Sequence, residues 1–125
     1  MREKFERGNI YTLKKDVKAA DIEYTPHAKF TGVYLKHLVT GDMTDGLISC
    51  HIVKVEPNCV LDFHQHENAV EIHEVIEGDG ICTIGQKDVK YEVGSLGVMP
   101  KGVPHKIAAG KDGIAVLAKF TPPLK

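Results

Sequence analysis

The chain has 125 residues, 42% hydrophobic and 26% charged, which is typical of one compact globular domain with a core of its own. Sixteen basic residues nearly cancel seventeen acidic ones, so no basic surface for nucleic acid is indicated. The longest apolar run, Ile114 to Ala118, is far too short to span a bilayer. We therefore expect neither nucleic acid nor a membrane as a partner.

The N-terminus and the cysteines bear on location. The opening residues, MREKFERGNI, are charged and lack the apolar stretch of a secretory signal. The three cysteines, Cys50, Cys59 and Cys82, form no C-x-x-C pair and are an odd number. We expect reduced cysteines that pack as small hydrophobic side chains in a cytoplasmic protein.

The chain divides by texture into two parts. Residues 1–29 are rich in charge and lack sustained periodicity. We expect an N-terminal arm there, with one strand around NIYTL and a short helical turn around KKDVKAA. Residues 30–125 are expected to form a single domain.

From residue 30 onward, short segments rich in branched and aromatic residues alternate with turn signals, which is typical of strands. No segment shows a sustained 3.6-residue apolar period, and crossover helices have no room. The sequence therefore predicts an all-β antiparallel barrel or sandwich with little helix. The expected strands are GVYLKHLVT (32–40), LISCHIVKVE (47–56), VEIHEVIEG (70–78, ending at the turn signal GDG), the hairpin ICTIG–VKYEV, and GIAVLAKF near the end.

The stretch HQHENAVEIHEV, residues 64–75, concentrates potential metal ligands. His64 and His66 are two apart, so on a strand they share a face with Cα atoms about 6.6 Å apart, close enough to bind a common ion. Glu71 follows after four residues, enough for a turn that returns the next strand. His105, fixed by the Pro/Gly-rich MPKGVPH, is the natural fourth ligand. The alternatives are surface polar residues or a barrel that has lost its metal.

These segments resemble the two motifs of the cupin family. Two positions depart from the family pattern, Asn58 in place of a glycine and Ala109 in place of an asparagine that is not a metal ligand. Asn tolerates positive φ better than most residues, so the first change is mild. The first motif corresponds to Asn58, CVLDF, His64-Gln65-His66, ENAV, Glu71, IHEVIE and Gly78, and the second to Gly94, SLGVM, Pro100-Lys101-Gly102, VP, His105, KIA and Ala109.

The resemblance implies a cupin double-stranded β-helix, or jelly-roll barrel, over about residues 30–122. It also implies one divalent transition metal ion near a barrel mouth, held by His64, His66, Glu71 and His105. Imidazole and carboxylate ligands leave iron, manganese, nickel, copper and zinc open. By resemblance, Glu71 is also a possible catalytic base. Small cupins commonly form homodimers by crossing N-terminal strands, and residues 1–29 suit a swapped strand.

Other side chains are weaker candidates. His73 shares the inward face with Glu71, so it is either an acid–base group beside the metal ligands or a histidine bonded to a neighbouring strand. His51 faces the pocket or is a hydrogen-bonded core residue. Phe63 and Met99 are possible pocket residues that cannot be separated from ordinary core.

Two functions follow from this site. The first is a metalloenzyme, oxygenase-like or using other Lewis-acid chemistry, that acts on a small organic substrate. The second is a non-catalytic cupin module that binds or senses a small molecule or a metal. Fold alone does not choose between them.

Overall fold

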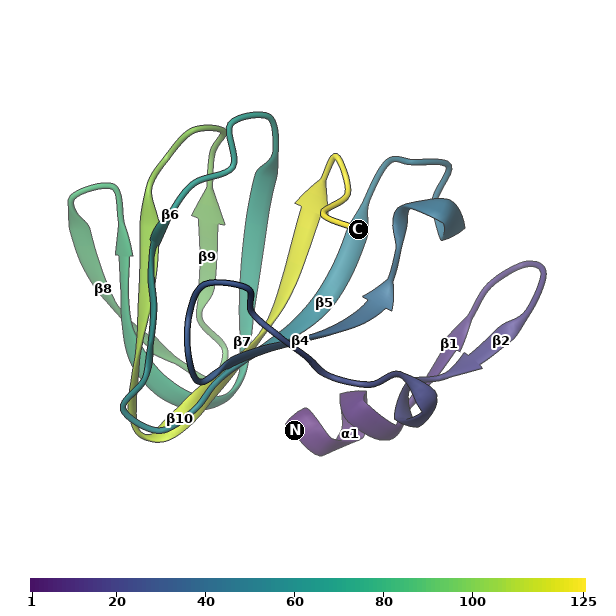
Figure 1. Cartoon of the computed structure of the whole chain (residues 1–125), viewed down its shortest axis with the longest axis horizontal. Coiled ribbons are helices and arrows are strands. Elements are labelled where there is room, and N and C mark those ends of the chain that lie inside the picture. Colours follow the sequence, from purple (N-terminus) through teal and green to yellow (C-terminus); the bar gives the residue numbers. More distant parts are fainter.

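The computed structural model describes residues 1–125 and consists mainly of antiparallel β-structure (Figure 1). Helical structure is confined to α1 (Arg2–Arg7) and the short 3₁₀ turns η1 (Ala19–Asp21) and η2 (Gly41–Met43). None of these helical segments has the length and apolar character needed to cross a membrane. The strands are β1 (Asn9–Tyr11), β2 (Asp16–Lys18), β3 (Thr25–Pro26), β4 (Val33–Val39), β5 (Ser49–Val55), β6 (Val60–His64), β7 (Val70–Ile84), β8 (Lys87–Glu92), β9 (Leu96–Met99) and β10 (His105–Thr121).

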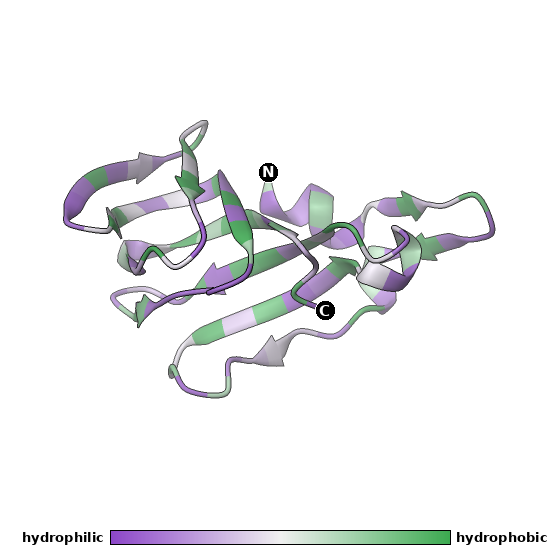
Figure 2. Ribbon diagram, turned by 90° about the horizontal axis from the view of Figure 1, so that it is seen from above, coloured by the Kyte–Doolittle hydropathy of each residue, from purple (hydrophilic) through white to green (hydrophobic).

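Eight strands form one curled sheet in the order β3-β4-β5-β10-β7-β8, with β6 paired to β10 and β9 paired to β7. Hydrophobic and hydrophilic residues alternate along the strands (Figure 2), as expected where one face of a sheet is buried. The inward face holds the main core: Val33, Val53, Val55, Leu61, Val75, Cys82, Tyr91, Ile107, Ile114, Val116, Ala118 and Phe120. The all-β prediction is confirmed.

The two longest strands, β7 and β10, pair along most of their length. The expected turn at GDG is wrong, because β7 continues through it to Ile84. Gly78 has a positive φ of 74°, and a Cβ there would overlap the carbonyl oxygen of Gly113. The register shifts between Ala109 and Ile114. The glycines therefore mark a bend where two strands approach closely, not a chain reversal.

The N-terminal arm is more structured than expected. It begins with α1, and KKDVKAA contributes β2 before η1 rather than a helical turn alone. The Thr12 hydroxyl donates to the Lys15 carbonyl oxygen and accepts from the Lys15 N–H, closing a turn that pairs β2 with β1. This hairpin projects from the end of the molecule opposite β8 (Figure 1).

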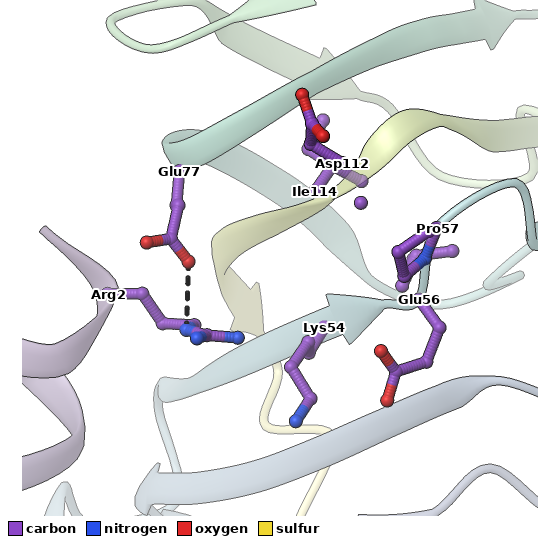
Figure 3. A pocket seen from close by; sticks show the side chains of 9 residues that line it. Arg2, Lys54, Glu56, Pro57, Glu77, Asp112 and Ile114 are labelled. Atoms are coloured by element: carbon purple, nitrogen blue, oxygen red, sulfur yellow. Dashed lines mark ion pairs between the residues drawn. The ribbon is translucent and has the colours of Figure 1, made fainter.

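The base of this hairpin and the rest of the arm pack on the outer face of the sheet. A second apolar cluster there includes Leu38, Ile52 and Leu117, and Ile10 and Tyr24 from the arm pack against it. The helix α1 is joined to β7 by an ion pair, in which Arg2 Nε lies 2.9 Å from Glu77 Oε2. Lys54 and Asp112 line the same pocket (Figure 3). The arm is thus attached to the barrel by apolar contacts and an ion pair.

Candidate metal centre

A β-bulge turns His64 toward the barrel interior. His64 pairs with His105 and Leu61 pairs with Ile107, so two residues of β6 lie opposite the single residue Lys106. The extra residue changes the alternation, so Leu61 and His64 both face inward. Phe63 lies on the outer side, 49% exposed, with the Lys106 ammonium over its ring. The structure therefore does not bring Phe63 to the pocket.

The expectation that His64 and His66 lie on one regular strand is wrong. β6 ends at His64, and His66 lies in the loop to β7. Its carbonyl oxygen accepts a hydrogen bond of 2.9 Å from the N–H of Gly102. Gly102 has a positive φ of 72°, which favours glycine. The Pro-x-Gly turn of one motif thus fixes the backbone of a candidate ligand from the other.

Four candidate ligands meet at this place. Glu71 on β7 and His105 on β10 are buried, and His64 and His66 are half-buried. One ligand atom from each residue lies within 4.8 Å of the others. Glu71 Oε1 and His105 Nε2 are 3.0 Å apart, yet neither makes a hydrogen bond of acceptable geometry. Buried polar atoms without partners are costly, and a metal ion between them would supply the missing partner. The residues fit a divalent transition metal.

Hydrogen bonds to backbone carbonyls determine which ring nitrogen of His64 and of His105 is free to bind a metal. His64 Nδ1 lies 2.9 Å from the carbonyl oxygen of Asp62, and His105 Nδ1 lies 3.0 Å from that of Val103. Because a carbonyl oxygen only accepts, each Nδ1 carries the proton and donates. The Nε2 atoms are then left as the ligand atoms facing the cluster.

The charge states also suit a metal. Burial lowers the pKa of His64 to about 4 and lowers that of His66. For His105 burial lowers the pKa, but the Glu71 carboxylate beside it outweighs burial and raises it. For Glu71 burial raises the pKa, but the imidazoles of His105 and His73 outweigh burial and hold it well below its usual range. Neutral His64 and His66 with an ionised carboxylate are the forms that bind metals.

His73 joins the Glu71 carboxylate to the core. Its Nε2–H donates to Glu71 Oε2 at 2.7 Å, and its Nδ1 lies 2.9 Å from the hydroxyl of Tyr91. Gly97 lies directly opposite His73 on β9, and a Cβ there would overlap the Tyr91 hydroxyl. The network binds Oε2 and leaves Oε1 facing the three candidate histidines. His73 therefore both bonds to a neighbouring strand and contacts a candidate ligand.

Two further predicted residues are buried but do not line the cavity beside the candidate ligands. His51 Nδ1 lies 2.7 Å from His37 Nδ1, and its Nε2 lies 2.7 Å from Ser49 Oγ. Met99 is buried on β9, paired with Glu71 across the strands. Neither lines the cavity beside the candidate ligands.

That cavity has a volume of about 70 Å³. It is lined by the candidate ligands His64, His66 and Glu71 and by Leu35, Val53, Leu61, Phe120, Leu124 and His27. The sequence carries no signal for His27, because it lies in the loop between β3 and β4 and no spacing pattern connects it to the motifs.

The curled sheet and the cluster at its mouth define a small β-barrel protein with a candidate metal centre. A family model described as a cupin domain matches residues 51–119, more than half of the chain. The chain belongs to the cupin family.

Solved structures agree on the fold. KdgF from Halomonas sp. is 19% identical, with a TM-score of 0.73 over 82% of this chain and 88% of that chain. A predicted oxalate decarboxylase from Thermotoga maritima is 23% identical, with a TM-score of 0.75 over 85% of this chain and 97% of that one. An RmlC-like cupin from Shewanella frigidimarina is 14% identical, with a TM-score of 0.73 over 85% and 88%. No curated relative matches the sequence.

Proposed function

We propose that this cupin is a metalloenzyme that binds one divalent transition metal ion, iron, manganese, nickel, copper or zinc, and acts on a small organic substrate. His64, His66, Glu71 and His105 would hold the ion. The observation that carries the proposal is the convergence of four ligand atoms within 4.8 Å, two of them buried without a hydrogen-bond partner. Structural likeness to a predicted oxalate decarboxylase is consistent with such chemistry.

When bound, the ion would supply Lewis-acid or oxygenase-type chemistry, because three imidazoles and one carboxylate leave positions open. The chain's own residues would hold the substrate in the adjacent cavity and exclude water with the apolar wall. Glu71 suits the ligand role better than that of a mobile base, since its Oε2 is already bound by His73. A base role would require that hydrogen bond to break.

The experiment is metal content by mass spectrometry on protein purified without chelators. Near one equivalent of a transition metal is expected in the parent, and a large loss in His64→Ala and His105→Ala. His37→Ala is the matched control, because His37 is a half-buried histidine bonded to His51 away from the cluster. Absence of metal even after anaerobic reloading with each ion would refute the proposal.

The alternative is a cupin module that binds or senses a small molecule or metal without turnover. The small, mostly apolar cavity favours it, because His27 is the one polar group on its wall besides the candidate ligands. The two proposals differ in turnover. Consumption of any bound small molecule by the metal-loaded protein, lost in His64→Ala, would exclude the binding module.

We further propose a cytoplasmic homodimer. In support of the location, the three cysteines form no disulfide. The support for the dimer is that Tyr11 and Leu13 of the projecting hairpin are both largely exposed, at 73% and 102%, so two neighbouring apolar side chains there lack cover on their own chain. Sedimentation velocity tests this. The parent is expected to sediment with twice the monomer mass, and Leu13→Asp with the monomer mass. A monomeric parent would contradict the dimer.

A further inference from the structure

One residue of the cavity wall is polar without being a candidate metal ligand. His27 lies in the loop between β3 and β4 and lines the same cavity as His64, His66 and Glu71. Its ring packs on Phe30, with ring centroids 4.8 Å apart, and Phe30 in turn lies 6.3 Å from the His64 ring. The loop therefore places this imidazole on the cavity that three of the candidate ligands line.

The loop backbone also fixes the proton of His27. The backbone N–H of Lys29 donates to His27 Nδ1 at 3.0 Å, and that of Phe30 reaches the same atom at 3.4 Å. Since Nδ1 accepts, the remaining proton of the neutral ring is on Nε2. Burial, with Lys29 nearby, lowers the pKa of His27, which favours this neutral form. No hydrogen bond in the structure reaches Nε2, so it is a free donor.

Charge on the cavity wall limits what can be bound. One divalent ion and the ionised Glu71 carboxylate leave a net charge of about one positive unit. No lysine or arginine lines the cavity, and Lys29 is exposed outside it. A ligand with one negative charge would be neutralised by the site. A dianion would leave a buried charge without a partner, which is costly.

The cavity also limits size and polarity. Its volume of about 70 Å³ is well below the roughly 300–1,000 Å³ of pockets for drug-sized ligands. Apart from His27 and the candidate ligands, the cavity is lined by Leu35, Val53, Leu61, Phe120 and Leu124. The part of a ligand that enters this cavity should therefore have a handful of non-hydrogen atoms and an apolar end.

We propose that the site takes a small monoanionic ligand, of the 2-hydroxy- or 2-oxo-monocarboxylate type, and that His27 Nε2–H donates a hydrogen bond to it. This proposal rests on the proposed metal centre. The metal would bind the oxygens of the ligand, His27 would orient it, and the leucine, valine and phenylalanine side chains would contact its alkyl end.

The experiment compares lactate with oxalate, which have the same number of non-hydrogen atoms but differ in charge. Protein loaded with one equivalent of Co²⁺ is titrated with each, read out by the visible absorption of Co²⁺ and by calorimetry. Each affinity is divided by the affinity of the same anion for aqueous Co²⁺, which removes intrinsic chelation. We expect this ratio to be at least tenfold higher for lactate.

Variants test the role of His27. His27→Phe should weaken lactate binding about three- to tenfold, as expected for loss of one hydrogen bond, while Co²⁺ stoichiometry stays near one. His27→Gln, which keeps a donor, should restore most of the affinity. Lys29→Gln is the matched control from the same loop and should bind lactate within twofold of the parent.

The outcomes separate the two proposals. A parent that binds no Co²⁺ overturns the metal centre and this inference with it. A parent that binds Co²⁺ but favours oxalate by the normalised ratio overturns the ligand class alone. Lactate binding that is equal in the parent and in His27→Phe overturns the hydrogen bond from His27 alone. A loss in Lys29→Gln that matches His27→Phe would assign anion recognition to the exposed lysine and overturn the role of His27.

Discussion

At the scale of single residues, the candidate ligands are oriented by hydrogen bonds to the atoms that do not face the cluster. Glu71 is oriented through Oε2 by His73, which is itself bonded to Tyr91. His64 and His105 are oriented through Nδ1 by backbone carbonyls. Partners of this kind typically change metal affinity by 10–100-fold when removed. The ligands are thus presented by a network that reaches into the core.

Tyr91→Phe should therefore weaken metal binding about tenfold, because His73 loses the hydroxyl that fixes its ring. The measurement is metal affinity by competition with a chromophoric chelator. Tyr34→Phe, on β4 away from the centre, serves as control and should bind metal like the parent. Equal affinity in Tyr91→Phe and the parent would show that the ring of His73 is held by packing alone.

A second prediction concerns the buried pair of His51 and His37. Burial lowers the pKa of His51 to about 4, with His37 adding to the effect. The unfolded chain binds this proton near pH 6.5, so between pH 6.5 and 4 the unfolded state holds more protons. Stability from His51 is complete above pH 6.5 and should decline on acidification, by about 3 kcal/mol at most.

The measurement is the free energy of unfolding by urea at several pH values, for the parent and His51→Asn. The difference in slope between them isolates His51 from other titrating groups. Identical slopes would mean that His51 carries no such proton linkage.

At the scale of elements, close approach between β7 and β10 decides where the chain bends. Gly78 and Gly94 both have positive φ, 74° and 96°, but only a Cβ at Gly78 would meet backbone atoms. Gly94→Ala should cost about 1–2 kcal/mol for its conformation alone. Gly78→Ala should cost at least about 2 kcal/mol more, because Gly113 must also move. Urea unfolding checks this, and equal losses in the two variants would refute the close-approach explanation.

The same elements show what the sequence could predict. Strand alternation and motif spacing are local, so the all-β fold and the four candidate ligands followed from the sequence. The predicted tolerance of Asn58 for positive φ is confirmed, at 60°. The bulge that turns Phe63 outward depends on pairing with β10, and the continuity of β7 through GDG depends on Gly113. His27 enters the cavity only through a loop whose path no local pattern indicates.

At the scale of the whole molecule, the candidate ligands come from segments far apart in the sequence. His66 lies before β7 and His105 opens β10, so an ion bound to both joins the two motifs. Such an ion would bind the folded state and not an unfolded chain in which these segments are apart. Metal binding should therefore raise global stability.

At a free metal concentration about 1,000 times Kd, the free energy of unfolding should rise by about 4 kcal/mol. The measurement is urea unfolding of chelator-treated protein with and without added metal. His105→Ala should show little of this increase. An equal rise in parent and variant would place the stabilising ion elsewhere.

In the proposed centre, three histidines and one glutamate hold a single metal ion. Zinc-edge X-ray absorption on protein loaded with one equivalent of Zn²⁺ tests it most directly. Imidazole and carboxylate scatterers are expected at about 2.0–2.2 Å, with the multiple-scattering signal of about three imidazoles. A sulfur scatterer near 2.3 Å, or oxygen scatterers without imidazole, would contradict it.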